Sequence, residues 1–310
     1  MSLWSEAMPV PTSSSFGTRK SGISGSCRTD MTHGRCSRAS ALQLSDPFGS
    51  EVCRRAVQMP FFETAHGKSY YRRWDARRPV GGVVFLHGFG EHSGHYHRLA
   101  GAFNASGLAM WALDQQGHGL SYGERGAVAS MDSLVDNAGR LISIAASEAP
   151  GLPLVLVGHS LGGIAAALSI ARGERRCLGL AVTGTLIQPE TVAIPAAPEV
   201  TRDPFYLDML ATDPFAFSVT PESTAARRAA MNRARGELIA TLPEVDLPVL
   251  LINGDQDVIA PARHARAVRS KLKNATALIV KDGFHDIIND APHFAVERRL
   301  VAFAKAAIRV

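Results

Sequence analysis

The chain has 310 residues and a formal net charge of +5, with 46% hydrophobic and 20% charged residues, which is ordinary for a globular protein. It contains no basic stripe with interleaved aromatic residues, so we expect no nucleic-acid partner. No apolar run reaches the length of a membrane span, and the N-terminus lacks the apolar core of a signal peptide.

Residues 1–50 are rich in Ser, Gly and Thr and show no hydrophobic periodicity, which predicts a disordered N-terminal extension. The folded domain is then expected to span residues 51–310. Reduced thiols in a cytoplasmic protein are the simplest interpretation of the four cysteines. The first three of them, with a nearby histidine, match no zinc motif and are not expected to bind metal: Cys27, His33, Cys36 and Cys53.

Two short strands joined by a turn are expected at Arg54–Phe62 and Lys68–Trp74, where side chains alternate as in a half-buried hairpin. Beyond them, short apolar runs alternate with helical patterns. The predicted strands are Val83–Leu86, Leu108–Asp114, Leu152–Val157, Cys177–Val182, Pro248–Ile252 and Thr276–Val280. The predicted helices are Tyr96–Ser106, Met131–Glu148, Ile164–Ala171, Pro261–Lys271 and His293–Ile308.

This alternation predicts an α/β fold built on a mostly parallel, doubly wound sheet. Residues 185–240 break the alternation, because prolines recur there among apolar residues, and they are predicted to form a short cap insertion. We expect most apolar side chains of this cap to fill its own core and some to line a pocket over the strand ends. They are Leu186, Ile187, Ile194, Phe205, Tyr206, Leu207, Met209, Leu210, Phe215 and Phe217.

The sharpest local pattern lies between the strand Leu152–Val157 and the helix Ile164–Ala171. Here Gly158 and Gly162 flank Ser160 at a spacing typical of a nucleophile elbow. A Cβ atom at either glycine is expected to collide with neighbouring backbone, because the turn is so tight. Ser160 should then sit at the tip with a strained backbone and an exposed hydroxyl.

A serine hydroxyl needs a base to accept its proton, and the base needs a carboxylate behind it. The carboxyl ends of the two following strands supply these groups, in the order serine, aspartate, histidine. His285 is the expected base, and Asp257 is the expected carboxylate. Asp255 is the alternative, although its place directly after Gly254 suits a turn-forming role. The oxyanion donors are expected to be the backbone N–H groups of Leu161 and Phe89.

Three stretches resemble the monoacylglycerol lipase-like α/β-hydrolases, also described as serine aminopeptidase- or lysophospholipase-like: His87–Tyr96, Asp114–Ser121 and Gly158–Gly163. The resemblance covers the chain from about residue 55 to the C-terminus. It implies an α/β-hydrolase fold and a serine hydrolase that cleaves carboxylic esters. It also implies that Ser160, Asp257 and His285 hold the triad positions, and Phe89 and Leu161 the oxyanion-hole positions.

The chain departs from this family pattern at two places. Gln116 stands where many members have arginine, in a loop that is expected to be structural. The insertion between Val182 and Leu247 is shorter than the usual cap.

The loop histidines His92, His95 and His97 suggest a metal site, but three histidines in a loop have no fixed common face. We therefore expect no metal and no cofactor. His118 and His159 are expected to be packed, hydrogen-bonded groups beside the site.

The function we predict is hydrolysis of medium- to long-chain acyl esters, such as monoacylglycerols or lysophospholipids, through an acyl-enzyme on Ser160. The partner is then a small acyl ester, with transient contact to lipid surfaces through the cap. A thioesterase or acyltransferase would use the same acyl-enzyme, and a cofactor-free perhydrolase stays open. An epoxide hydrolase or dehalogenase would ordinarily need a carboxylate in place of Ser160. A binding protein on an inactive hydrolase fold is the alternative from another class.

Overall fold

The computed structural model describes residues 60–309, with gaps at 129, 189–194, 196–197 and 219–220. The predicted extension 1–50, and all but the end of the predicted strand Arg54–Phe62, lie outside the described residues. Among the helices that are described, none is long and apolar enough to cross a membrane.

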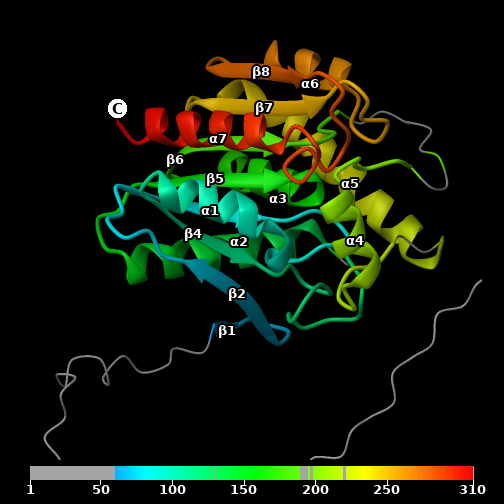
Figure 1. The fold of residues 1–310 in the computed structure, drawn as a ribbon, viewed down its shortest axis with the longest axis horizontal. Helices are drawn as coiled ribbons and strands as arrows, with labels where there is room; N and C mark the ends of the chain where they lie inside the picture. The colour runs from blue at the N-terminus through cyan, green and yellow to red at the C-terminus, as the bar shows by residue number, and fades with distance from the viewer. Residues whose placement is uncertain (1–59, 129, 189–194, 196–197, 219–220, 310) are drawn as a thin grey trace, which may run out of the picture. The chain divides into compact units, whose positions relative to one another are not determined.

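An eight-stranded sheet runs through the described part of the chain, in the order β1-β2-β4-β3-β5-β6-β7-β8 (Figure 1). The pairs β1–β2 and β2–β4 are antiparallel. The remaining neighbours are parallel, which confirms the predicted mostly parallel, doubly wound sheet. The strands are β1 Phe61–Glu63, β2 Lys68–Trp74, β3 Gly81–Leu86, β4 Leu108–Leu113, β5 Leu154–His159, β6 Cys177–Thr183, β7 Val249–Gly254 and β8 Ala275–Val280.

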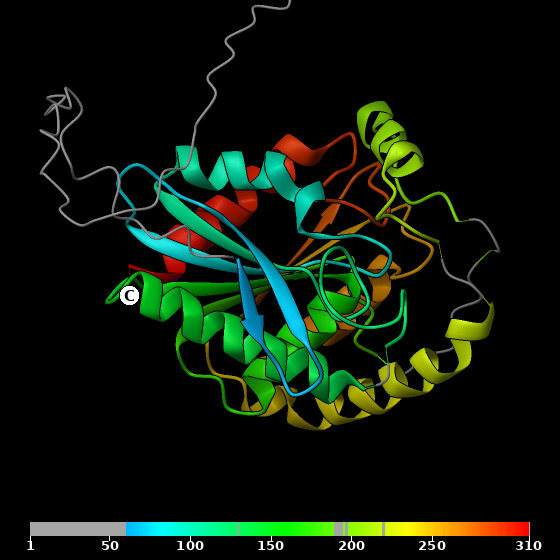
Figure 2. The same cartoon turned by 90° about the horizontal axis from the view of Figure 1, so that it is seen from below.

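Helices cover both faces of this sheet, so its central strands are buried on both sides (Figure 2). Every residue of β3, β4, β5 and β7 is buried, which explains why these strands are almost continuously apolar. One face packs against α1 His97–Ala105 and α7 His293–Ala307. The other packs against α2 Met131–Glu148, α3 Ser160–Ala171, α5 Pro221–Thr241 and α6 Ala262–Arg269.

The helix ends follow local capping chemistry. The α2 helix has the predicted bounds, and its first turn is capped because Ser130 Oγ accepts the Asp132 N–H at 3.0 Å. The predicted helix from Tyr96 begins one residue later, because Ser93–Tyr96 form a 3₁₀ turn, η2. The His92 side chain caps that turn.

The segment between β6 and β7 carries two helices, α4 Pro204–Thr212 and α5, followed by a short 3₁₀ turn, η3 Leu242–Glu244. Ala230, Ala234 and Leu238 of α5 are buried in the core shared with α2 and α3. A helix packed on α3 and α2 therefore connects β6 to β7. In Figure 1, α4 lies beyond the strand ends, on the side where the arrowheads point.

Apolar residues of the predicted cap have divergent environments. Leu186, Ile187 and Tyr206 are buried. Phe205 and Leu207, which flank Tyr206 on α4, are 55% and 47% exposed. Phe205 and Leu207 are therefore not among the residues that fill a cap core, because successive residues of a helix point in different directions and Tyr206 takes the buried side. Ile194 lies outside the described residues.

Candidate active site

The turn from β5 into α3 places Ser160 at its tip. Ser160 has a φ angle of 48°, in the left-handed region that residues with a Cβ rarely adopt. A Cβ at Gly158 would collide with the Gly162 backbone, and a Cβ at Gly162 would collide with the Leu86 backbone. The predicted reason for both glycines is confirmed. The first N–H groups of α3 lack intrahelical acceptors and carry its positive dipole end.

Three side chains from the carboxyl ends of β5, β7 and β8 meet at this turn. Ser160 Oγ lies 2.9 Å from Nε2 of His285. The other ring nitrogen, Nδ1, lies 3.1 and 3.0 Å from the two carboxylate oxygens of Asp257. His285 and Asp257 are buried. An imidazole held between a hydroxyl and a carboxylate can accept the hydroxyl proton and be stabilised as a cation.

The two candidate aspartates have different surroundings. Asp257 Oδ1 also accepts the backbone N–H groups of Ile259 and Ala260, at 2.9 and 2.8 Å. Asp255 is exposed, and its backbone N–H donates to Val280 O at 3.0 Å, which joins the turn to β8. Of these two side chains, the structure brings only Asp257 to the imidazole. Its catalytic role stays a prediction.

Opposing effects set the pKa values of this pair. Burial alone would raise the pKa of Asp257, but the charge and hydrogen bond of His285 and two backbone N–H groups lower it below its usual value. Burial alone would lower the pKa of His285, but Asp257, Asp286 and Glu91 together raise it to about 9. The folded protein therefore favours a cationic imidazole against an ionised carboxylate.

The two expected oxyanion donors flank the serine from different elements. Leu161 lies in the first turn of α3, and Phe89 follows Gly88 after β3. The Gly88 N–H donates to Glu91 Oε2 at 2.8 Å, so a buried carboxylate holds this loop in place. The role of Phe89 and Leu161 as oxyanion donors stays a prediction.

Glu91 is a buried anchor that our reading of the sequence missed. Its carboxylate accepts the hydroxyls of Tyr96, at 2.7 Å, and of Tyr206 on α4, at 2.5 Å. Burial would raise the pKa of Glu91, but His159, His95 and the two tyrosine hydroxyls hold it well below its usual value. The available signal in the sequence was a carboxylate in the loop directly after a fully apolar strand. A carboxylate that is buried at such a place must be paired, so partners for Glu91 could have been sought.

A second buried pair, His159 and Asp286, lies beside the ring of His285. His159 Nδ1 lies 3.1 Å from Thr183 O, and its Nε2 lies 3.3 Å from Asp286 Oδ1. This confirms the interpretation of His159 as a hydrogen-bonded group beside the site, but its partner Asp286 was not foreseen. Burial, and then the charge of Glu91, raise the pKa of Asp286.

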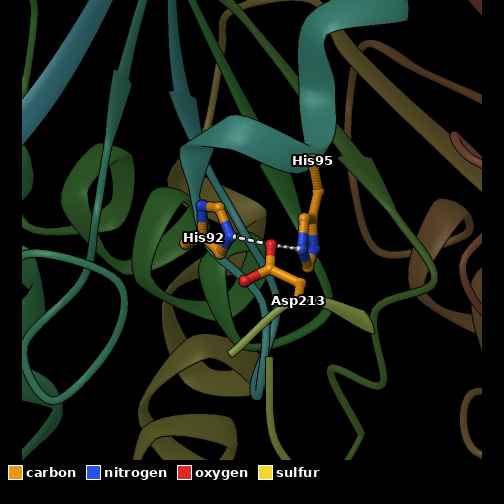
Figure 3. A group of neighbouring side chains, drawn as sticks. All are labelled: His92, His95 and Asp213. Carbon is orange, nitrogen blue, oxygen red and sulfur yellow. Dashed lines mark hydrogen bonds and ion pairs between the residues drawn. The ribbon is translucent and has the colours of Figure 1, made fainter. Parts of the chain in front are cut away.

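The loop histidines converge on one carboxylate, as Figure 3 shows. His92 Nε2 and His95 Nε2 lie 2.7 and 3.0 Å from the same oxygen, Oδ2 of Asp213. The expectation that these histidines lack a common face is wrong for these two, because the η2 turn places both rings on one side. His97 is exposed, and its Nδ1 lies 3.4 Å from Gly94 O. We call His92, His95 and Asp213 the clasp, since it joins the loop after β3 to the residues after α4.

Two groups of described residues have ligand atoms close enough to share a metal ion: His92, His95 and Asp213, and His159, His285 and Asp286. In the clasp, the Gly94 N–H donates to His92 Nδ1, which leaves the ring proton on Nε2, the atom that faces the carboxylate. In the second group, both nitrogens of His285 contact the serine and Asp257. Hydrogen bonds account for both arrangements, and the expectation of no metal stays a prediction.

Comparison with known proteins gives matches along most of the chain. Residues 77–200 match the family described as "Serine aminopeptidase, S33", and residues 223–306 match that described as "TAP-like protein". The chain is 29% identical over 236 residues to a monoacylglycerol lipase of Mycolicibacterium smegmatis, covering 68% of this chain and 83% of that protein. It is 26% identical over 258 residues to the monoglyceride lipase of Homo sapiens, covering 76% and 85%.

The fold is similar to the crystal structure of Paleococcus ferrophilus monoacylglycerol lipase, with a TM-score of 0.66 at 22% identity. That alignment covers 77% of this chain and 99% of the other.

Proposed function

The chain belongs to the monoacylglycerol lipase-like α/β-hydrolases, and from this premise we propose that it is a serine hydrolase cleaving carboxylic esters through an acyl-enzyme on Ser160. The observation that carries the proposal is the 2.9 Å contact between Ser160 Oγ and His285 Nε2, with Asp257 on the opposite side of the ring. A surface histidine is not expected to be buried between a strained serine and a buried carboxylate, as His285 is.

In the first half of the reaction, His285 Nε2 takes the hydroxyl proton while Ser160 Oγ attacks the ester carbonyl. Asp257 keeps Nδ1 protonated and stabilises the imidazolium. The negative charge that forms on the carbonyl oxygen is met by the N–H groups of Leu161 and Phe89. His285 then gives its proton to the departing alcohol, which leaves the acyl group on Ser160.

In the second half, a water molecule loses a proton to His285 and attacks the acyl carbon. The bond to Ser160 Oγ then breaks, His285 returns the proton to this oxygen, and the carboxylic acid leaves. The same groups serve both halves, because the imidazole alternates between base and acid. No metal or cofactor is required for either half in this scheme.

The substrates we propose are medium- to long-chain acyl esters, such as monoacylglycerols. Two of the relatives are named as monoacylglycerol or monoglyceride lipases. In this chain, Phe205 and Leu207 present apolar surface on α4, beyond the strand ends that carry the triad. Exposed apolar side chains at such a place suit transient contact with a lipid surface.

Labelling with a fluorophosphonate probe tests the mechanism, since the probe reacts with activated serines. The wild-type protein should be labelled and the Ser160→Ala variant should not. Ser169→Ala is the matched control, because Ser169 lies on the same helix and only donates to Ala165 O. Loss of labelling in the control alone, or labelling of Ser160→Ala, would overturn the proposal.

Turnover of p-nitrophenyl esters with acyl chains of two to sixteen carbons tests the substrate class. Rates that peak at the longer chains support the lipase-like proposal. Turnover of only the acetate and butyrate esters would keep the mechanism and discard the lipid substrate.

A further inference from the structure

Four separate segments meet around Phe89, the residue expected to donate one oxyanion hydrogen bond. Its ring packs edge-on against His118, at 5.3 Å between ring centroids, and against Phe217, at 5.4 Å. The Phe217 N–H donates to Gly90 O at 3.0 Å. Gly126 lies against both phenyl rings, where a Cβ would meet Phe217 at 2.9 Å. The loops after β3 and β4 and the residues after α4 therefore share one aromatic cluster.

The fourth contribution is a cation from α5. The Arg227 guanidinium carbon lies 3.8 Å from the centroid of the Phe89 ring. The side chain is half-buried, and its Nη1 atom is shielded from solvent with no hydrogen-bond partner among the described residues. Burial, and then the charge of Arg228, lower the pKa of Arg227. Its neighbour Arg228 is exposed.

Partly buried arginines among the described residues differ in their partners. Arg73 and Arg98 pair with the carboxylates of Glu148 and Asp203. Arg235 donates to Leu186 O and Asn232 Oδ1, and Arg72, like Arg227, lies over aromatic rings with one shielded nitrogen that has no hydrogen-bond partner. Three carboxylates on the segments that meet at the cluster hold other partners. Glu91 accepts two tyrosine hydroxyls, Asp213 accepts the clasp histidines, and Asp114 accepts the backbone N–H groups of Ser93 and Leu120.

A charged group shielded from solvent is costly unless it is paired, so the half-buried Arg227 guanidinium, which has no carboxylate partner among the described residues, needs an explanation. We propose that Arg227 binds an anionic group, a phosphate or a carboxylate, carried by the ester substrate beyond its scissile bond. This inference rests on the proposed hydrolase function and names a substrate class within it. The guanidinium presents several N–H donors in a plane, which suits the oxygens of either anion.

The position of Arg227 relative to the triad supports this role. It contacts the side chain of Phe89, whose backbone N–H is expected to face the reacting carbonyl. The proposal requires that a charged group on the leaving alcohol, separated from the ester by a few atoms, reaches Arg227 while the ester reaches Ser160. A second guanidinium, Arg125, lies 5.7 Å from the Phe217 ring and donates to Pro214 O at 2.9 Å. Arg125 therefore adds positive charge beside the aromatic cluster that Arg227 contacts.

The test compares two esters that differ only in charge: 1-octanoylglycerol and 1-octanoylglycerol 3-phosphate, both below their micelle concentrations and at fixed ionic strength. The variants are Arg227→Gln and, as matched control, Arg228→Gln, because Arg228 is exposed and its loss changes the net charge equally. For the phosphate ester, kcat/KM should fall about tenfold or more in Arg227→Gln, as expected for a lost charge-assisted hydrogen bond. For the neutral ester, kcat/KM should fall less in Arg227→Gln than it does for the phosphate ester, and it should stay within about twofold of the wild type in Arg228→Gln.

Equal losses for the two esters in Arg227→Gln would overturn the inference, because a residue that only supports the Phe89 ring affects both alike. A loss for the phosphate ester in Arg228→Gln as large as that in Arg227→Gln would also overturn it, because this result would indicate a general attraction between charges. Arg227→Lys keeps the charge and should recover part of the preference, which guards against a folding defect.

A binding measurement separates this inference from the proposed function. In the Ser160→Ala background, calorimetry should show affinity for the phosphate ester weakened about tenfold by Arg227→Gln, with unchanged affinity for the neutral ester. If the fluorophosphonate probe does not label the wild-type protein, the proposed hydrolase function is wrong. If the probe labels it but Arg227→Gln leaves the affinity for the phosphate ester unchanged, only the anion site is wrong.

Discussion

Two regions meet at the reacting edge of the sheet, and they are held in place by different contacts. The edge itself, where β5, β7 and β8 end, depends on close backbone packing. A Cβ at Gly254 would collide with the backbone of Gly283, just as a Cβ at Gly158 or Gly162 would collide with backbone near the elbow. The cap side depends on side chains that reach across: Tyr206 to Glu91, Asp213 to His92 and His95, and Arg98 to Asp203.

The loop carrying His285 is tied to both regions. Asp290 accepts the Phe284 N–H at 2.7 Å with one oxygen. With the other oxygen it accepts Thr201 Oγ1 at 3.0 Å and the Arg202 N–H at 2.8 Å. Contacts between backbone atoms resist displacement, because no side-chain rotation can relieve them. Contacts between side chains, as on the cap side, can break when the side chains rotate. We therefore expect the chemistry to depend on the edge, and substrate access to depend on the cap.

The largest expected effect comes from removing the nucleophile or the base. Ser160→Ala and His285→Ala should each lower kcat by about 10⁴-fold or more, because the hydroxyl and imidazole act as one unit. The thermal unfolding midpoint of each variant should stay close to that of the wild type. Residual turnover within a few-fold of the wild type in either variant would contradict the assignment.

Replacing the carboxylate should have the next largest effect. Asp257→Asn should lower kcat by up to about 10⁴-fold, because an amide no longer holds the imidazole in the reactive tautomer. Asp255→Asn is the matched control, since Asp255 is exposed two residues away and does not contact His285. A larger loss in Asp255→Asn would reverse the roles of the two residues.

The pH dependence of kcat/KM also tests the role of Asp257, and we expect a smaller effect there. Only the neutral imidazole can accept the Ser160 proton, so the rate should rise with pH up to the pKa of His285. Asp257 and its neighbours raise that pKa, so the apparent pKa should exceed the usual value of about 6.5. In Asp257→Asn it should move downward, because burial then acts with less opposition. An apparent pKa that rises in this variant would contradict the electrostatic account.

These regions also differ in how far they can be predicted from sequence. The elbow and the order of serine, aspartate and histidine are local patterns at strand ends, so the residue pattern alone is enough to predict that Ser160, Asp257 and His285 lie together, as they do. Their catalytic roles stay a prediction. The clasp pairs Asp213 with residues 118 and 121 positions earlier, and no periodicity links the two segments. Likewise, the contact of Arg227 with Phe89 depends on how α5 returns to the sheet. Such contacts arise from packing between distant segments, which hydrophobic patterns do not specify.

The smallest expected effect comes from opening the clasp. Asp213→Ala should lower the free energy of unfolding by about 1–2 kcal/mol, because two imidazole N–H groups lose their acceptor and one belongs to the buried His95. Asp208→Ala is the matched control, since Asp208 is an exposed residue of α4 with the same charge. Chemical denaturation of both variants gives the comparison, and hydrogen exchange in α4 should quicken only in Asp213→Ala.

The acid dependence of this effect has a definite sign. The clasp histidines and the Phe215 N–H act against burial and lower the pKa of Asp213 to about 2. The stabilisation should therefore be complete above the usual carboxyl pKa of about 4 and be lost as pH falls towards 2. The stability gap between the wild type and Asp213→Ala should narrow over that range. A gap that widens there would mean that the clasp depends on histidine protonation rather than on the Asp213 carboxylate.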